Sequence, residues 1–142
     1  MPNVPVELSR LKAACEAIVK GGERMFKWEW DGRFHAALSP FREDDRAAVH
    51  ALLERTFPGH WDIKTIEVAA PVVRDAARFF GGLRAGQELF VMGEDGPVIM
   101  SAAWWPWGSG DTISIRIKPL TKEVSEPEER RLVSEFRGWF GL

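Results

Sequence analysis

The segments 98–105 and 112–118 constrain the fold most, because their side chains alternate as in β-strands. Isoleucine occupies every second position from 113 to 117, between polar residues. Such period-two alternation is typical of a strand with one buried face. Placing Trp105 opposite Thr112 brings Trp104 to the isoleucine face and matches the apolar residues along both strands. We therefore predict an antiparallel hairpin closed by the loop 106–111.

A third strand, residues 88–92, precedes this hairpin and is joined to it through Glu94-Asp95-Gly96. Either two-residue turn within 94–96 gives the same facing, with Leu89 and Val91 on the core side. The opposite face then carries an apolar group made of Phe90, Met92, Ile99 and Trp105.

Four segments have apolar residues at helical spacing and plausible ends. They are residues 5–20, a segment that follows Ser39-Pro40 and ends at 57–59, residues 71–80, and a segment that opens with the capping box Ser125 to Glu128 and continues to the chain end.

Two further strand regions complete the prediction. Residues 25–38 form a hairpin in which a three-residue loop, 31–33, pairs Trp30 with Phe34 and Trp28 with Ala36 and keeps one face apolar. A single strand is expected over residues 63–68.

These elements predict one α+β domain over residues 1–142. A mostly antiparallel six-stranded sheet is packed by four helices, in the order α-β-β-α-β-α-β-β-β-α. The strand order around the second and third helices stays open, and a parallel pair is possible there.

Composition excludes several classes of function. The formal net charge is −2 and the 19 basic residues are scattered, so we expect no nucleic-acid partner. Cys15 is the single cysteine, which excludes an intrachain disulfide and a cysteine-cluster zinc site. The longest apolar run, 98–105, is too short to span a membrane, and residues 1–5 do not resemble a signal peptide. We expect a cytoplasmic protein, and seven Trp with no Tyr fits a GC-rich bacterial genome.

The sequence contains no motif that predicts a cofactor or a catalytic residue. Residues 81–86 have phosphate-loop spacing, but Gln87 and Glu88 stand where Lys and Ser or Thr are needed. Ser109 lies between two predicted strands, whereas a nucleophile elbow joins a strand to a helix. A buried structural thiol is the preferred interpretation of Cys15.

The three histidines give no diagnostic pattern. His35 is predicted to form a solvated pair with Glu29. His50 and Glu54 lie one helical turn apart, and His60 and Asp62 follow after the loop at Pro58-Gly59. These four residues could converge on a divalent metal or do acid–base chemistry. Arg46 would repel an ion there, so the sequence does not favour a metal site.

The tryptophans are the most distinctive feature. Trp28, Trp30 and Trp104 are predicted to fill the core. Trp105 and Trp107 are either an exposed binding surface or lie beneath a helix.

We therefore expect a non-catalytic protein-interaction module, such as an adaptor, chaperone or inhibitor, that binds a protein partner or self-associates as a homodimer. Its predicted surface is Trp105, Trp107, Phe90, Met92 and Ile99. One alternative is a domain that binds an apolar small molecule in a pocket lined by Trp28, Trp30 and Trp104. The other is a small enzyme that uses histidine and carboxylate side chains.

Overall fold

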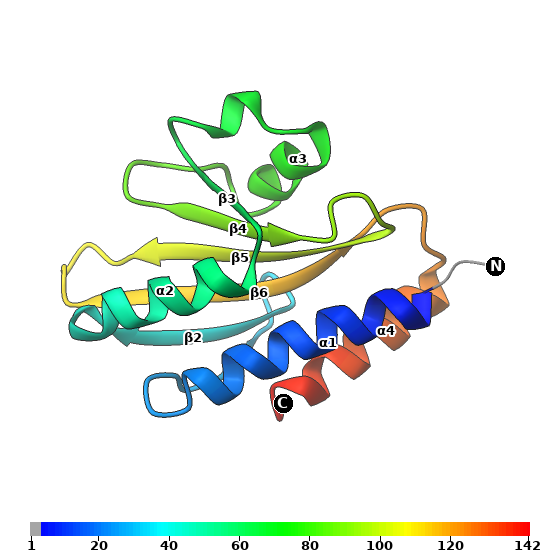
Figure 1. Ribbon diagram of the computed structural model, residues 1–142, viewed down its shortest axis with the longest axis horizontal. Helices are drawn as coiled ribbons and strands as arrows, with labels where there is room; N and C mark the ends of the chain where they lie inside the picture. Colours follow the sequence, from blue (N-terminus) through cyan, green and yellow to red (C-terminus); the bar gives the residue numbers. More distant parts are fainter. Residues whose placement is uncertain (1–3) are drawn as a thin grey trace.

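The computed structural model describes residues 4–142, with side chains from Leu8 onward. Residues 1–3, on which the argument against a signal peptide partly rests, lie outside the described residues. All strand pairs are antiparallel, and the sheet has the order β1-β2-β6-β5-β4-β3 (Figure 1). The six strands are β1 (Glu29–Asp31), β2 (Ala36–Arg42), β3 (Gly59–Asp62), β4 (Glu88–Met92), β5 (Val98–Pro106) and β6 (Thr112–Thr121). The predicted α+β fold and its order of elements are confirmed.

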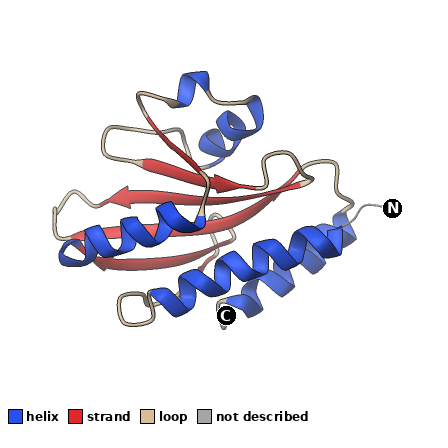
Figure 2. Ribbon diagram, viewed as in Figure 1, coloured by secondary structure: helices blue, strands red, loops and turns tan. Residues whose placement is uncertain are grey.

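Four α-helices and two short 3-10 helices lie within the described residues (Figure 2). The α-helices are α1 (Val4–Gly21), α2 (Arg46–Thr56), α3 (Pro71–Phe79) and α4 (Glu126–Trp139), and the 3-10 helices are η1 (Glu43–Asp45) and η2 (Ile66–Val68). Ser125 is the N-cap of α4, because its hydroxyl accepts a hydrogen bond from the backbone N–H of Glu128, which is one half of the predicted capping box. No helix of the described part of the chain is long and apolar enough to cross a membrane.

The sheet is covered on both faces. Helices α1, α2 and α4 pack on one face over the larger core, which contains Trp104, Phe136 and the three alternating isoleucines. Cys15 is fully buried there, and this burial raises the pKa of its thiol, as expected of an unreactive structural cysteine. Helix α3 packs on the other face over a smaller core around Val73, Leu89 and Val91.

The β5–β6 hairpin has the predicted faces but a different register. Trp105 pairs with Ser114, two residues from the predicted partner Thr112. The loop is also two residues shorter, because the N–H of Trp107 bonds to the Thr112 carbonyl and only residues 108–111 lie between them. A shift of two residues leaves every side chain on its face, so Trp104 and Ile115 lie in the larger core as predicted.

The predicted facing of β4 is wrong. Phe90 pairs with Ala102 and Met92 pairs with Met100, because the β4–β5 connection spans residues 93–97 instead of a two-residue turn. That change in length moves every β4 side chain to the other face. Phe90 and Met92 therefore lie in the larger core, while Ile99 belongs to the smaller one beneath α3.

The register of the β1–β2 hairpin also differs from the prediction. Asp31 pairs with Ala36 and Trp30 with Ala37, across a loop of residues 32–35. The Asp31 carboxylate accepts hydrogen bonds from the N–H groups of Arg33 and Phe34, which stabilises this longer loop. Phe34 consequently packs on the smaller core instead of pairing with Trp30.

Two predicted boundaries are wrong. Ser39 and Pro40 continue β2 and do not begin a helix. Pro40 is tolerated because β1 pairs with β2 only as far as Leu38, so one side of β2 is free beyond that point. The strand expected over residues 63–68 lies earlier, at residues 59–62, and is β3. In the turn that follows, the Asp62 carboxylate accepts hydrogen bonds from the N–H groups of Lys64 and Thr65.

A largely buried ion pair fastens the β1–β2 loop to the sheet. Asp31 Oδ2 lies 2.7 Å from Arg116 Nε, and the two side chains are 10% and 18% exposed. The Arg116 guanidinium also stacks over Trp105. Burial alone would raise the pKa of Asp31, but the hydrogen bonds from Arg116 and from two backbone N–H groups outweigh it and lower this pKa below 3.8.

The substitution Asp31→Asn is expected to destabilise the protein by about 2 kcal/mol at neutral pH, because it leaves the Arg116 charge without its partner. A carboxylate with a lowered folded-state pKa contributes stability above its unfolded pKa and loses it as pH falls through the folded value. Urea unfolding of both proteins should therefore show a difference that shrinks below about pH 4. An equal difference at pH 7 and pH 2 would show that the ion pair is not its source.

Candidate metal centre

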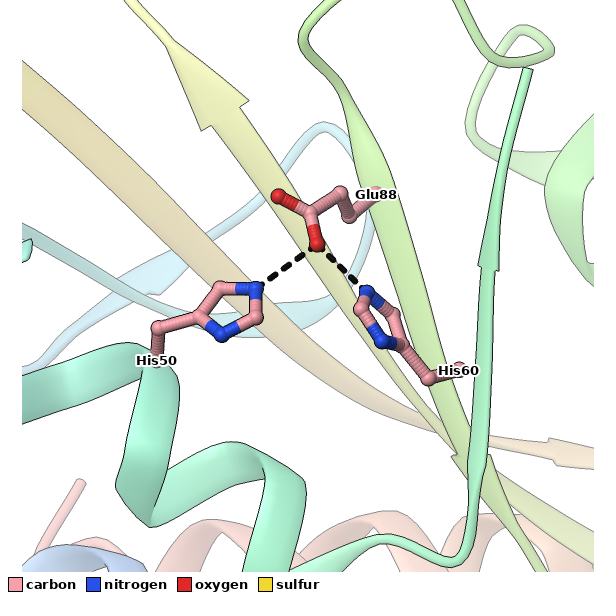
Figure 3. Close-up of side chains that lie close together, drawn as sticks. All are labelled: His50, His60 and Glu88. Atoms are coloured by element: carbon pink, nitrogen blue, oxygen red, sulfur yellow. Dashed lines mark hydrogen bonds and ion pairs between the residues drawn. The ribbon is translucent and has the colours of Figure 1, made fainter. Parts of the chain in front are cut away.

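Three side chains from different elements converge at one end of the sheet (Figure 3). They are His50 of α2, His60 of β3 and Glu88 at the start of β4. His50 Nε2 lies 2.7 Å from Glu88 Oε1, and His60 Nε2 contacts the same carboxylate oxygen. One ligand atom from each residue lies within 4.8 Å of the others.

Helix α2 places His50 beside its buried stripe. Val49 and Leu53 anchor the helix to the larger core, and His50 lies at the edge of that contact. Its ring packs edge-on against Trp104 and Phe90, with centroid distances of 5.1 and 5.4 Å. The imidazole is therefore held by aromatic packing as well as by hydrogen bonds.

Strand β3 places His60 directly opposite Phe90 of β4. The two rings are stacked, with centroids 4.4 Å apart and planes 5° from parallel. The preceding residue, Gly59, permits this close pairing, because a Cβ there would lie 2.6 Å from the Val91 side chain. Phe90, which is fully buried, thus packs against both imidazoles.

The pairing of β4 with its two neighbouring strands places Glu88 beside the two histidines. Glu88 is the first residue of β4, and its cross-strand neighbours are Asp62 and Trp104. Its side chain is 16% exposed, compared with 24% for His50 and 36% for His60. The group is thus partly shielded from water but open on one side.

Glu54 contacts the far side of the His50 ring, where its Oε1 lies 2.6 Å from Nδ1. Burial lowers the pKa of His50, but the hydrogen bonds to Glu88 and Glu54 outweigh this effect. The pKa of His50 is therefore above its ordinary value.

The sequence left open whether four residues converge, and the structure brings three of them together. His50, Glu54 and His60 are joined through direct contacts. Asp62 instead caps the turn after β3. Arg46, expected to repel an ion, pairs with Glu43, with 3.4 Å between the charged atoms.

Sequence reasoning missed Glu88. It stands 38 positions after His50 in the chain, and no motif links them. The signal that could have found it is the start of β4, which was located correctly, combined with the pairing of β3 onto β4. The sequence did not reveal that pairing, because this strand was predicted at residues 63–68 and β3 comprises residues 59–62.

Two imidazole nitrogens and one carboxylate oxygen form a ligand set that suits Zn²⁺ and related transition ions. Ligand atoms on a tetrahedral ion with bonds of about 2.0–2.1 Å lie about 3.4 Å apart. The present separation of 2.7 Å between His50 Nε2 and Glu88 Oε1 would have to widen by roughly 0.7 Å. A movement of the Glu88 carboxylate by that distance would be needed to admit the ion.

The predicted interaction surface is not assembled. Phe90, Met92 and Ile99 are at most 5% exposed, and the first two lie on the opposite face of the sheet from the third. Trp105 is partly buried against Phe34 and Phe80. Trp107 is 50% exposed.

The three tryptophans expected either to fill the core or to line a pocket lie at the larger core. Trp104 is fully buried, and Trp28 and Trp30 pack against the same core as fillers. A separate hollow of about 300 Å³ lies between α3, the β4–β5 turn and the end of β6, where Phe79, Pro97 and Leu120 line it.

Comparison with protein-family models, with curated proteins and with solved structures finds no match to this chain. The inference of function therefore depends on the geometry of the site.

Proposed function

We propose that this protein binds a divalent transition-metal ion through His50, His60 and Glu88. The observation that carries the proposal is the convergence of two imidazole Nε2 atoms on one carboxylate oxygen. The three residues come from three elements, so their meeting is a product of the tertiary fold.

Aromatic packing also holds the two rings, in addition to the hydrogen bonds to Glu88. His60 is stacked on Phe90, and His50 packs against both Phe90 and Trp104. Such packing fixes ligands in advance and reduces the entropy that binding an ion would cost. A pair of hydrogen-bonded surface histidines would not need this support.

The chemistry of the donors names the class of ion. Imidazole nitrogen with carboxylate oxygen favours Zn²⁺, Mn²⁺, Fe²⁺ or Co²⁺. Mg²⁺ and Ca²⁺ prefer ligand sets made of oxygen alone. Three protein ligands leave at least one coordination position for water, which is the arrangement of catalytic rather than closed structural zinc sites. A metal-dependent enzyme is therefore the second candidate, favoured by the partial exposure of His60.

The test is equilibrium binding of Zn²⁺ to metal-depleted protein. We expect one ion per chain, and we expect the variant His60→Phe to lose at least about 10-fold in affinity. Phenylalanine keeps the ring that stacks on Phe90 and removes only the ligand nitrogen. Mg²⁺ at the same concentration should not compete.

The matched control is His35→Asn. His35 has a left-handed backbone, with φ of 53°, which asparagine tolerates. This variant removes a histidine from the β1–β2 loop and should bind Zn²⁺ like the original protein. Equal loss in both variants, or no binding by the original chain, would rule out the proposed site.

The other functions expected from the sequence have less support. Protein binding is still supported by the exposed Trp107, but the apolar group that suggested it, which includes Phe90 and Ile99, is buried. Small-molecule binding is favoured by the hollow beside α3, whose volume is at the lower end for ligand pockets.

A further inference from the structure

Glu54 lies outside the ligand group but contacts one of its members. It follows His50 by one turn of α2, so the two side chains lie on the same helix face. Its Oε1 is 2.6 Å from His50 Nδ1, whereas Nε2 of the same ring faces Glu88. The two nitrogens of this imidazole thus have separate partners.

These contacts determine which nitrogen is available to an ion. A neutral imidazole has one N–H and one lone pair. When the Nδ1–H donates a hydrogen bond to Glu54, the lone pair is on Nε2, the atom that points into the site. A carboxylate in this position also fixes the ring orientation and increases the basicity of the ligand nitrogen.

We infer that Glu54 is a positioning residue for the metal ligand His50, an inference that rests on the metal-binding function proposed above. Glu54 is not itself a ligand, because the oxygen that contacts the ring lies at Nδ1, away from the Nε2 side. It selects the tautomer and the orientation in which His50 binds the ion.

The competing interpretation is an ordinary surface pair on a helix. The Glu54 side chain is 54% exposed, and exposed pairs at this spacing contribute little to stability. The two interpretations differ in their consequences. A surface pair has no effect on metal affinity, whereas a positioning residue affects metal affinity while leaving the stability of the metal-free protein unchanged.

The experiment compares Zn²⁺ affinity in the original protein with that in Glu54→Ala and Glu54→Gln. Alanine removes the acceptor and should weaken binding about 10- to 100-fold. Glutamine keeps an acceptor oxygen without the charge, so its loss should be smaller. The urea midpoints of all metal-free proteins should agree.

Asp62→Asn is the matched control for charge. Asp62 is the cross-strand neighbour of Glu88, and asparagine keeps the oxygen that caps the turn after β3. This variant removes one negative charge beside the centre without touching His50, and its affinity should stay within about threefold of the original.

Imidazole nitrogen NMR of the zinc-loaded proteins supplies the spectroscopic readout. In the original protein, Nδ1 of His50 should carry a slowly exchanging proton and Nε2 should have the shift of a metal-bound nitrogen. In Glu54→Ala, exchange of the Nδ1 proton should become fast. If the original protein binds Zn²⁺ but Glu54→Ala binds equally well with the same exchange rate, the inference is overturned and the metal site stands. If the original protein binds no metal, both are overturned.

Discussion

Zinc at 100 times its dissociation constant is expected to raise the melting temperature of the metal-depleted protein by about 10 °C. An ion that binds only the folded state at that concentration stabilises it by about 2.7 kcal/mol. In a chain of this size each kcal/mol corresponds to about 4 °C. The ligands come from α2, β3 and β4, which are brought together only by folding, so the unfolded chain should bind the ion far more weakly.

Glu88→Gln and His60→Phe test whether the gain comes from this centre. Each removes one ligand while keeping a side chain of similar size, so a loss of affinity of at least about 10-fold should reduce the shift caused by zinc to about 6 °C or less. Differential scanning fluorimetry at several zinc concentrations measures the effect. A shift of the same size in the variants would place the bound ion elsewhere on the molecule.

Trp104→Ala is expected to destabilise the protein by about 3–5 kcal/mol, because it truncates the largest of the fully buried side chains. Trp104 packs against Phe41 and His50, with centroid distances of 5.3 and 5.1 Å. Removal of the indole leaves a cavity at the centre of the larger core. Urea unfolding followed by circular dichroism measures the change.

Trp104→Phe and Trp107→Ala are the companion variants. The indole N–H of Trp104 has no hydrogen-bond partner within the described residues, so phenylalanine loses volume but no hydrogen bond and should cost less than half as much as alanine. Trp107 is half-exposed, and its replacement should change stability by no more than about 0.5 kcal/mol. Equal costs at positions 104 and 107 would contradict the described packing.

The fold was predictable where side-chain alternation and helical stripes are strong. The three isoleucines of β6 specify its buried face, and the Ser125 capping box specifies the start of α4. Hairpin registers were less predictable, because they depend on loop length. The five-residue connection between β4 and β5 moved Phe90 to the opposite face from the one predicted.

The site could be predicted only in part, for a related reason. His50 and Glu54 were identified as neighbours because helical spacing is fixed. His60 and Glu88 meet through the pairing of an edge strand only four residues long, Gly59–Asp62. So short a strand has too little alternation to reveal its limits or its partner.

Anomalous diffraction at the zinc absorption edge, from crystals of the zinc-loaded protein, would locate the bound ion among its ligands. We expect one strong peak about 2.0–2.1 Å from Nε2 of His50, from Nε2 of His60 and from a carboxylate oxygen of Glu88. A zinc ion bound elsewhere, with the two histidines still hydrogen-bonded to Glu88, would show that these three residues are not the metal centre.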